Sequence, residues 1–500
     1  MRTVQGVALD GLRARVRALA ARRRPERVGR APRGEALFAD RAPAVPGRGA
    51  GAPDRRTFVK ESLRQAVPAR ETTGRVPLAG LGALLRGLAR PRPGTVRASA
   101  SAAALRALRA RHGDAPVLVR TRSGRTVLVL LDPQDVRRFY AEPVGVLAAD
   151  PPDKCRGLSP QEPAGTGCSR GELRAERRQV SAEVLAAGLP VHPSCGLFLA
   201  ALAEEARHLT AGAPTASLDL DLARARYAVH RTARRIVLGD SAAADEELTG
   251  WLTQLRAEGE GLRGGRARAA RSLHARARAR IEAYAGHAAD DTLVGRAARY
   301  ADPTGTVDPV GQAQHWLLAM DAVPDTVLRT LLLLGAHPAE QDLAAAEAAA
   351  EATAGAGRGE LPRLRACVRE SLRLYPVVSD LIRVTGAETE WRGVRYPAGT
   401  SVLLPAAFHQ RDPERVPAAH VFVPGRWKNP GADQDVRMAP FSHGGGRCPG
   451  DQLGLMITAA LCAEVLRTHR VGRGRPVLDP VGPLPAALDP RGIRLTLTRR

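Results

Sequence analysis

The chain has 500 residues, of which 44% are hydrophobic, so it carries enough apolar sequence for a large buried core. Its formal charge of +24 comes almost entirely from arginines that are spread along the chain, so we expect no nucleic-acid partner. The 6 cysteines include no CxxC pair and are too sparse for a disulfide scaffold, which argues against both a zinc knuckle and a disulfide-rich fold. No stretch approaches the roughly eighteen apolar residues of a membrane span, and the N-terminus lacks the apolar segment of a signal peptide. We therefore expect a soluble protein of the reducing cytoplasm.

The first part of the chain differs in composition from the rest. Residues 1–75 are rich in Arg, Pro, Gly and Ala and cannot bury much surface, so we predict a flexible extension before a compact domain of residues 76–500. Within the extension, residues 9–24 have the spacing of a short basic amphipathic helix, which could touch a membrane surface or an acidic partner. A solvated tail is the simpler interpretation of the same residues.

The elements of the compact domain change type along the chain. Residues 101–112 have a helical pattern that ends at a glycine, and two β-prone runs joined by a Ser-Gly turn follow as a hairpin over residues 115–133. Residues 170–350 alternate Ala, Leu and Arg with helical spacing almost throughout. Strand signals return at residues 383–405 and in the C-terminal tail, residues 492–500. We predict a mainly α protein with small β-sheets.

The stretch FSHGGGRCPG, residues 441–450, places Cys448 between a run of glycines and the start of a helical pattern. We expect Pro449 at the first position of this helix, because proline needs no amide donor there. The positive end of the helix dipole should then lower the pKa of the Cys448 thiol. The three glycines leave room for a large flat group against the backbone. The stretch suits a thiolate that is screened and liganded, although a structural cysteine in a tight turn has the same residues.

These residues resemble the haem-binding loop of the cytochrome P450 family, whose pattern is Phe-x-x-Gly-x-Arg-x-Cys-x-Gly. The matching positions are Phe441, Gly444, Cys448 and Gly450. Gly446 occupies the place of the arginine, and Arg447 stands one residue later. The resemblance implies that Cys448 is the ligand of a haem iron, in a cofactor-binding loop formed by Phe441 and Gly444. It also implies that an arginine contacts a haem propionate, either Arg447 in a shifted loop or an arginine from elsewhere.

Two further motifs of the family follow in the order that the family has. In RESLRLYP, Glu370 and Arg373 lie one turn apart on one helix face, a spacing that by itself is common in solvated pairs. The later stretch VFVPGRW contains Arg426. The resemblance implies that these three residues form a buried network with a structural role.

The resemblance also implies two further contacts to haem propionates. Arg383 matches the arginine of the strand that follows the Glu-x-x-Arg helix in the family. A weaker match in RGELRAERRQV points to Arg178, or to its neighbour Arg177. A basic exposed helix face is the alternative interpretation of this second stretch.

The helical pattern over residues 307–337 resembles the family's central helix, in which an acid followed by threonine delivers protons to bound oxygen. The acid is present as Asp321, but Ala322 replaces the threonine, and Thr326 lies one turn further on. We predict catalytic roles for Asp321 and Thr326. Pro324 cannot donate to the carbonyl four residues earlier, so it should open the helix there. That opening could hold water, or it could be no more than a kink that suits the packing.

Taken together, the resemblance implies a cytochrome P450 fold and a haem-thiolate monooxygenase. We expect it to oxidise, most simply to hydroxylate, an apolar or natural-product-like small molecule of secondary metabolism with O2 and electrons from a separate ferredoxin-type donor. Two alternatives stay open. One is an atypical member that uses peroxide or rearranges an oxygenated substrate, and the other is a non-catalytic haem-binding protein.

Overall fold

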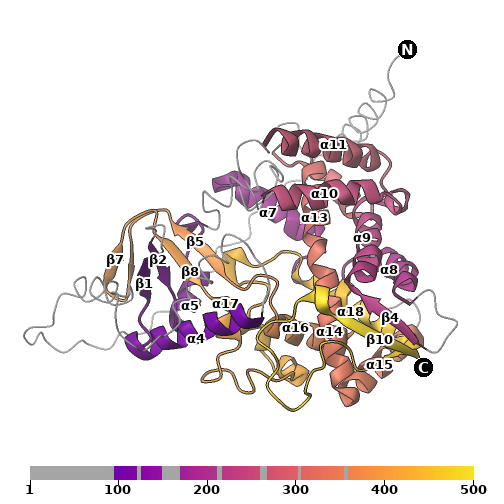
Figure 1. Cartoon of the computed structure of the whole chain (residues 1–500). Helices are drawn as coiled ribbons and strands as arrows, with labels where there is room; N and C mark the ends of the chain where they lie inside the picture. Colours follow the sequence, from indigo (N-terminus) through magenta and orange to yellow (C-terminus); the bar gives the residue numbers. More distant parts are fainter. Residues whose placement is uncertain are drawn as a thin grey trace, which may run out of the picture. The chain divides into compact units, whose positions relative to one another are not determined.

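Figure 1 shows the computed structural model of the chain, which describes residues 95–120, 126–148, 169–210, 217–259, 267–301, 306–353 and 359–500. The predicted flexible extension and the predicted start of the compact domain at residue 76 lie outside these ranges. No helix within the described ranges has the length and apolar character needed to cross a membrane.

Helices dominate the described residues, and the strands are short, so the predicted mainly α fold with small sheets is confirmed. The α-helices are α4 (Thr95–His112), α5 (Pro133–Ala141), α7 (Gly171–Val184), α8 (Cys195–Thr210), α9 (Leu222–Leu238), α10 (Glu246–Gly259), α11 (Ala267–Ala285), α12 (Leu293–Ala298), α13 (Pro309–Ala319), α14 (Val323–Ala336), α15 (Pro338–Thr353), α16 (Pro362–Leu374), α17 (Ala406–Gln410) and α18 (Asp451–Thr468). The strands are β1 (Val117–Arg120), β2 (Thr126–Val129), β3 (Leu147–Ala148), β4 (Ser217–Asp221), β5 (Leu381–Thr385), β6 (Thr389–Trp391), β7 (Val394–Tyr396), β8 (Ser401–Leu404), β9 (His469–Val471) and β10 (Arg494–Arg499).

The largest sheet has five strands in the order β1-β2-β8-β5-β3. β1 and β2 form the predicted antiparallel hairpin, in which Val117 lies opposite Val129. β8 runs parallel to β2 and antiparallel to β5, so strands that are distant in the sequence lie side by side in the sheet. Apolar clusters form against this sheet, one with Leu105 of α4 and one with Phe139 of α5. Through β5, the sheet fixes the position of Arg383.

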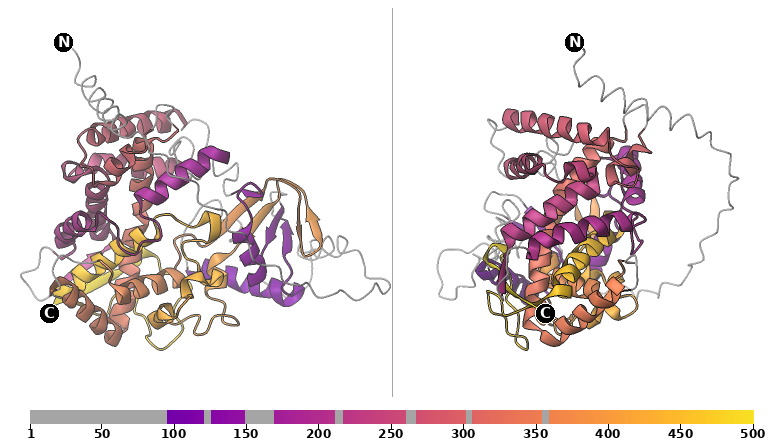
Figure 2. Two further views of the ribbon diagram at one scale, coloured as in Figure 1. Left: turned by 180° about the vertical axis from the view of Figure 1, so that it is seen from behind. Right: turned by 90° about the vertical axis from the view of Figure 1, so that its right-hand side faces the viewer.

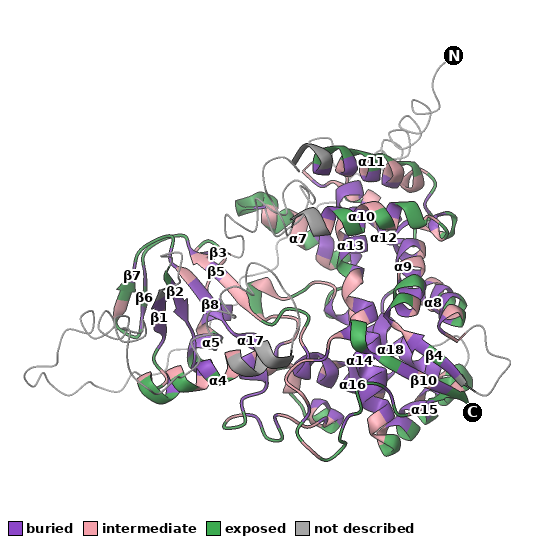
Figure 3. Ribbon diagram, viewed as in Figure 1, coloured by how far each residue is buried: buried purple, intermediate pink, exposed green. Residues whose placement is uncertain are grey.

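The main hydrophobic core lies among the helices, and α18 packs against α8, α14, α15 and α16 within it (Figure 2). Because neighbours surround α18, buried residues occupy most of its length (Figure 3). Each core position predicted from the sequence of this helix is at most 5% exposed: Leu453, Ile457, Ala460 and Leu461. The helix that follows the glycine-cysteine stretch is therefore anchored in the core.

A second sheet has three strands in the order β4-β10-β9. β10 is the predicted C-terminal strand, and it pairs antiparallel with β4. The prediction of nearly continuous helix over residues 170–350 is wrong at β4, where Leu218 and Leu220 are buried beneath the sheet. The alternation of SLDLD has the period of a strand, and pairing with the distant C-terminus stabilises it there.

The predicted opening in the central helix is present. α13 ends at Ala319, and a 3-10 turn, η2 (Met320–Ala322), separates it from α14. The amide of Val323 donates to the carbonyl of Met320, so the backbone itself satisfies the oxygen for which we expected water as a partner. Pro324 stands in the first turn of α14, where its missing amide donor has little cost.

Candidate functional site

The Cys448 loop is closed by its own backbone. The amide of Cys448 donates to the carbonyl of Phe441 at 2.9 Å, and the amide of Arg447 donates to the carbonyl of Gly444 at 3.0 Å. Phe441 also packs against the main core, which joins the start of the loop to the helical part of the domain. The expectation that Pro449 begins the following helix is wrong, because Gly450 is the N-cap and α18 starts one residue later. Cys448 therefore precedes the helix by three residues.

Two of the three loop glycines are required by their surroundings. Gly444 has a φ of +60°, and a Cβ at this position would lie 2.2 Å from the carbonyl oxygen of Tyr140. A Cβ on Gly446 would lie 2.7 Å from a guanidinium nitrogen of Arg383. Gly445 has more room, since its nearest neighbour would be a methyl group of Val144 at 3.8 Å. The loop thus lies against the backbone of α5 at position 444 and against the Arg383 side chain at position 446.

The Cys448 side chain lies near charged groups of α7 and of its own loop. This side chain is exposed, yet desolvation by the surrounding protein raises the pKa of the thiol. A hydrogen bond from the amide of Gly450 and the charges of Arg178 and Arg447 act in the opposite direction and do not outweigh the desolvation. The predicted lowering of this pKa is therefore wrong for the protein by itself, because the helix begins too late for its dipole to dominate. Binding to a metal ion would deprotonate such a thiol.

Arg178 of α7 reaches the Cys448 loop, and Arg174 of the same helix also donates to the loop, at the carbonyl of Gly445. Arg178 donates to the carbonyl of Arg447 at 2.5 Å, and the charge state of Cys448 influences its pKa. Its neighbour Arg177 points elsewhere, toward Ser169 and the carbonyl of Thr306. Desolvation lowers the pKa of Arg178. Of the two arginines that the sequence left open, the structure thus brings Arg178 to the loop.

Arg383 reaches the same loop from β5. Only 4% of its surface is exposed, and it donates to the carbonyl of Phe139 at 2.6 Å. Its guanidinium carbon lies 4.4 Å from the centre of the Phe139 ring, a distance typical of a cation–π contact. Desolvation lowers the pKa of Arg383, and the nearby charge of Arg174 lowers it further.

The two arginines share an unusual lack of counter-charge. Among the side chains that the structure describes, no carboxylate lies within ion-pair distance of Arg178 or Arg383. A desolvated cation without an acidic partner is costly, and a bound anionic ligand would offset that cost. Arg447 is different, because its guanidinium binds Asp451 at 2.7 Å on the first turn of α18.

The predicted network around Glu370 is present, with a fully buried centre and a partly buried Arg426 at its edge. Glu370 and Arg373 of α16 are both 0% exposed and bind each other through two hydrogen bonds, of 2.8 and 2.9 Å. Arg426 binds the same carboxylate at 3.1 Å, and the indole of Trp427 donates to it at 2.9 Å. The amide of Val423 donates to it at 3.0 Å. These contacts join α16 to the segment before the Cys448 loop and satisfy the Glu370 carboxylate within the chain, as a structural role requires.

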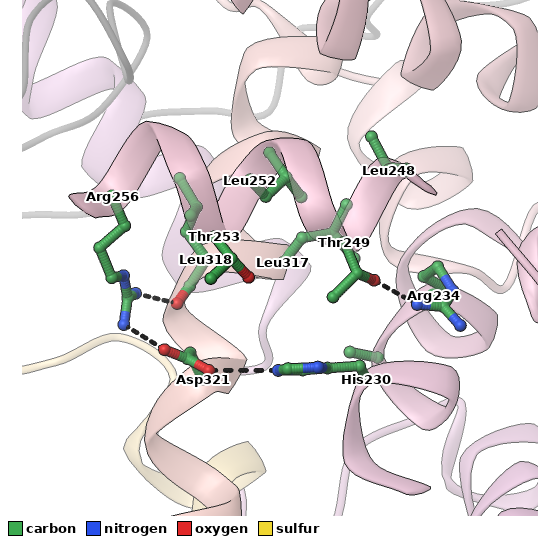
Figure 4. A pocket seen from close by; sticks show the side chains of 11 residues that line it. His230, Arg234, Leu248, Thr249, Leu252, Thr253, Arg256, Leu317, Leu318 and Asp321 are labelled. Atoms are coloured by element: carbon green, nitrogen blue, oxygen red, sulfur yellow. Dashed lines mark hydrogen bonds and ion pairs between the residues drawn. The ribbon is translucent and has the colours of Figure 1, made fainter. Parts of the chain in front are cut away.

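Asp321 of the 3-10 turn is held between two basic side chains (Figure 4). His230 of α9 lies 3.1 Å from one carboxylate oxygen, and Arg256 of α10 lies 2.7 Å from the other. Desolvation opposes the ionisation of Asp321, but the hydrogen bond with His230 and the charge of Arg256 outweigh it, so its pKa lies below the usual value. The three residues border a cavity of about 30 Å³, which has room for water.

Thr326 and Asp325 lie one turn further along α14. The hydroxyl of Thr326 donates to the carbonyl of Ala322 at 2.9 Å and is thus held at the break in the central helix. Asp325 has one carboxylate oxygen that is buried without a hydrogen-bond partner, and desolvation raises its pKa despite the nearby Arg329. We did not single out Asp325 from the sequence, although the pair Asp325-Thr326 repeats the acid-threonine order one turn after Asp321.

Asp380 is a second acid that we did not single out from the sequence. It lies between α16 and β5, where desolvation raises its pKa to about 6 and the hydroxyl of Ser379 donates to it at 2.9 Å. The adjacent Val377 and Val378 are 51% and 52% exposed, so this segment presents an apolar surface beside a desolvated acid. The sequence VVSD has no periodicity that would reveal this environment.

Comparisons with known proteins agree with these features. The family model described as Cytochrome P450 matches residues 324–496. A cyclooctat-9-en-7-ol 5-monooxygenase of Streptomyces melanosporofaciens is 37% identical over 177 residues, which cover 32% of this chain and 38% of that protein. The human mitochondrial 25-hydroxyvitamin D-1 alpha hydroxylase is 31% identical over 183 residues, which cover 35% of this chain and 36% of that protein. The chain thus spans well under half the length of these curated relatives.

The likeness of fold extends over more of the chain. The solved structure of the retinoic acid bound cyanobacterial CYP120A1 superposes with a TM-score of 0.63 at 16% identity. It covers 79% of this chain and 94% of that chain. This likeness shows the fold, and it confirms the cytochrome P450 architecture that the three sequence motifs imply.

The residues present fit the cofactor of this family. Cytochrome P450s bind haem iron, and haem has an iron that takes a thiolate ligand and two carboxylates on one edge. Cys448 offers an accessible sulfur, and Arg178 and Arg383 offer two desolvated cations beside the same loop. Residues 324–496 thus match the cytochrome P450 family model, and the described residues have the cytochrome P450 fold.

Proposed function

We propose that the chain is a haem-thiolate monooxygenase, with Cys448 as the iron ligand. The observation that carries the proposal is the Cys448 loop, where an accessible sulfur lies near the half-buried Arg178 and the buried Arg383. Neither arginine has a carboxylate partner among the described residues. A haem bound there through a thiolate supplies oxygen activation and favours cleavage of the O–O bond. In the proposal, Phe441 and Gly444 shape the loop, and Arg178 and Arg383 bind the haem carboxylates. Arg447 orders the start of α18 through Asp451.

The proposed substrate is an apolar small molecule of the natural-product kind. The relatives and the solved structure carry the names of cyclooctat-9-en-7-ol, 25-hydroxyvitamin D and retinoic acid, which are molecules built mostly of hydrocarbon. Val377 and Val378 add an exposed apolar surface in the segment that leads to Arg383. An apolar molecule would bury that surface with a favourable free energy.

The proposed electron donor is a separate ferredoxin-type protein. Support comes from two basic groups near the start of α18, Arg369 and Arg447. Desolvation lowers the pKa of Arg369, and the charge of Arg447 acts in the same direction, against Asp433 and Asp451. A basic surface attracts an acidic donor and speeds its association. Location in the cytoplasm remains a prediction from the sequence.

Asp321 and Thr326 are the residues that we propose for proton delivery. Thr326 holds its hydroxyl at the helix break, and Asp321 borders the small cavity on the α9 and α10 side of that break. Asp321 is ionised at neutral pH, because its pKa is lowered, so it can accept a proton only when it releases Arg256 or His230. Asp325 is the competing candidate, because its raised pKa favours the protonated acid.

The experiment compares Asp321→Asn and Asp325→Asn with the parent, using any ligand that shifts the haem spectrum as the trial substrate. Turnover is measured with a ferredoxin and reductant, and separately with hydrogen peroxide. We expect Asp321→Asn to lower the reductant-driven rate by about 10²–10⁴-fold, the usual contribution of a positioned acid or base. The peroxide-driven rate should change little, because peroxide is already reduced and protonated.

The same measurements separate the alternatives. If only Asp325→Asn shows the selective loss, Asp321 ties helices together and Asp325 belongs to the relay. A parent that works with peroxide alone supports the atypical enzyme, for which Ala322 in place of threonine is the motivating observation. A protein that binds haem and ligands but forms no product in either regime supports a non-catalytic binding role.

A further inference from the structure

The relation between Gly446 and Arg383 explains the departure from the family motif. In the motif an arginine stands two residues before the cysteine, and here that position is Gly446. The terminal nitrogen of Arg383 lies 2.7 Å from the point where a Cβ of residue 446 would be, and its guanidinium carbon lies 3.8 Å from that point. A separation under 3 Å is shorter than a real contact, so Arg383 occupies the volume that a side chain at position 446 needs.

Arg383 is fixed in this place by several contacts. It donates to the carbonyl of Phe139, it stacks on the Phe139 ring, and its backbone is held in β5, which is paired with a strand on either side. The neighbouring Arg447 does not compete for this volume, because its guanidinium is engaged with Asp451 at 2.7 Å. The loop backbone also has little freedom to retreat, since Gly444 lies against the carbonyl of Tyr140.

We propose that Arg383 and Gly446 are a reciprocal pair, in which the Arg383 guanidinium fills the space of the missing motif arginine and takes over its contact with a haem carboxylate. The pair rests on the proposed haem site at Cys448. The proposal predicts that the space between positions 383 and 446 fits one guanidinium, from either residue, but not two. An arginine at position 446 should therefore be harmful in the parent and helpful when Arg383 is removed.

The test is a double-mutant cycle with Gly446→Arg, Arg383→Ala and the variant that carries both. The measurement is the rate at which the ferric protein loses haem to an excess of apomyoglobin, together with the haem content after purification. We expect each single variant to lose haem at least about tenfold faster than the parent, the usual effect of removing a group that supports a metal site. The double variant should lose haem within about threefold of the parent rate.

A matched control uses the neighbouring glycine. Gly445→Arg places the same side chain one residue away, where a Cβ would meet only Val144 at an ordinary distance of 3.8 Å. It should leave haem loss in the parent background within about threefold, and it should not rescue Arg383→Ala. This control separates the specific volume beside Arg383 from a general effect of adding positive charge to the loop.

Gly446→Ala keeps the test decisive if Gly446→Arg fails to fold. The added methyl should speed haem loss in the parent, and the effect should disappear in the Arg383→Ala background, because the clash is then absent. Equal effects in both backgrounds, a Gly446→Arg protein that keeps haem like the parent, or a double variant no better than Arg383→Ala would each refute the pair. A parent that binds no haem would instead refute the proposed function.

Discussion

The Glu370 network and the Cys448 loop both contain buried arginines, but their charges are satisfied in opposite ways. Arg373 donates hydrogen bonds to Glu370 and to three backbone carbonyls, so its guanidinium is fully hydrogen-bonded and its charge is paired within the chain. Arg383 meets one carbonyl and an aromatic face, with no carboxylate at ion-pair distance among the described residues. The charge of Arg373 is thus balanced within the protein, whereas the charge of Arg383 would be balanced only when an anion binds.

The difference provides a way to tell structural charges from ligand-binding charges in one molecule. Burial costs both arginines their hydration, and only the network recovers the loss from protein groups. The carboxylates of haem are suited to recover it at the loop. Substitutions in the Glu370 network should therefore lower the stability of the fold. Substitutions at the Cys448 loop should instead weaken the retention of the cofactor.

The largest expected effect is on the network. Glu370→Ala leaves the buried cation of Arg373 and the partly buried cation of Arg426 beside an uncharged methyl group, which should reduce the free energy of unfolding by about 3–5 kcal/mol. Denaturant unfolding of the purified variant measures the loss, and a low yield of folded protein is part of the expected result.

Glu340 provides the control for this prediction. It binds Arg363 at 2.8 Å, but both side chains are partly exposed, 28% for Glu340 and 23% for Arg363. Glu340→Ala should therefore cost about 1 kcal/mol or less, as exposed ion pairs usually do. If the two glutamates gave equal losses, the account of the Glu370 network as a buried structural unit would be wrong.

The next effect concerns the loop. Arg178→Ala should keep the fold and its unfolding free energy but weaken haem binding by about 10–100-fold, because Arg178 supports the ligand and not the core. Arg177→Ala removes the same charge from the same helix at a side chain that points to Thr306, and it should bind haem like the parent. Haem loss to apomyoglobin measures both. Matching losses in the two variants would show that the net charge of α7, and not the position of Arg178, matters.

The smallest expected effect is the pH dependence of two aspartates with opposite shifts. The pKa of Asp380 is raised to about 6, so its contribution to stability is complete below pH 4 and is lost as the pH rises through 6. Asp380→Asn cannot ionise and should melt one to a few degrees above the parent at pH 7.5, with a smaller gain at pH 5.

Asp321 is the counterpart with a lowered pKa, so it stabilises the fold at pH values above its unfolded pKa. Asp321→Asn should melt below the parent at pH 7.5, and the difference should persist down to the unfolded pKa of about 4 and shrink only below it. Thermal unfolding curves of the apo variants at several pH values check both signs. Shifts in the same direction for both aspartates would contradict the contrast between a desolvated acid and an ion-paired one.

The sequence predicted those features that depend on spacing within one segment. The hairpin of β1 and β2, the buried face of α18, the break before Pro324 and the order of the three motifs all follow from local patterns. β4 was missed because five residues of alternation stand between long helices, and its partner β10 is almost three hundred positions away. Pairing at such separation is not visible in a local pattern.

The site was predictable in its residues and less so in its electrostatics. Cys448 and Arg383 were found by motif, but the thiol pKa was expected to fall and instead rises, because desolvation depends on the packing of distant segments. The same reason hides Asp325 and Asp380, whose raised pKa values come from burial that no spacing reveals. The place of Arg383 beside Gly446 likewise requires the sheet and the loop together.

The most direct test of the central claim is the absorption spectrum of the reduced protein with carbon monoxide. The parent should show the red-shifted band of a thiolate-ligated haem, Cys448→Ala should lose it, and Cys367→Ala should keep it, because Cys367 is fully buried in the helical core. A band that survives Cys448→Ala, or a parent that binds haem without the shifted band, would contradict Cys448 as the ligand and with it the whole account of the loop.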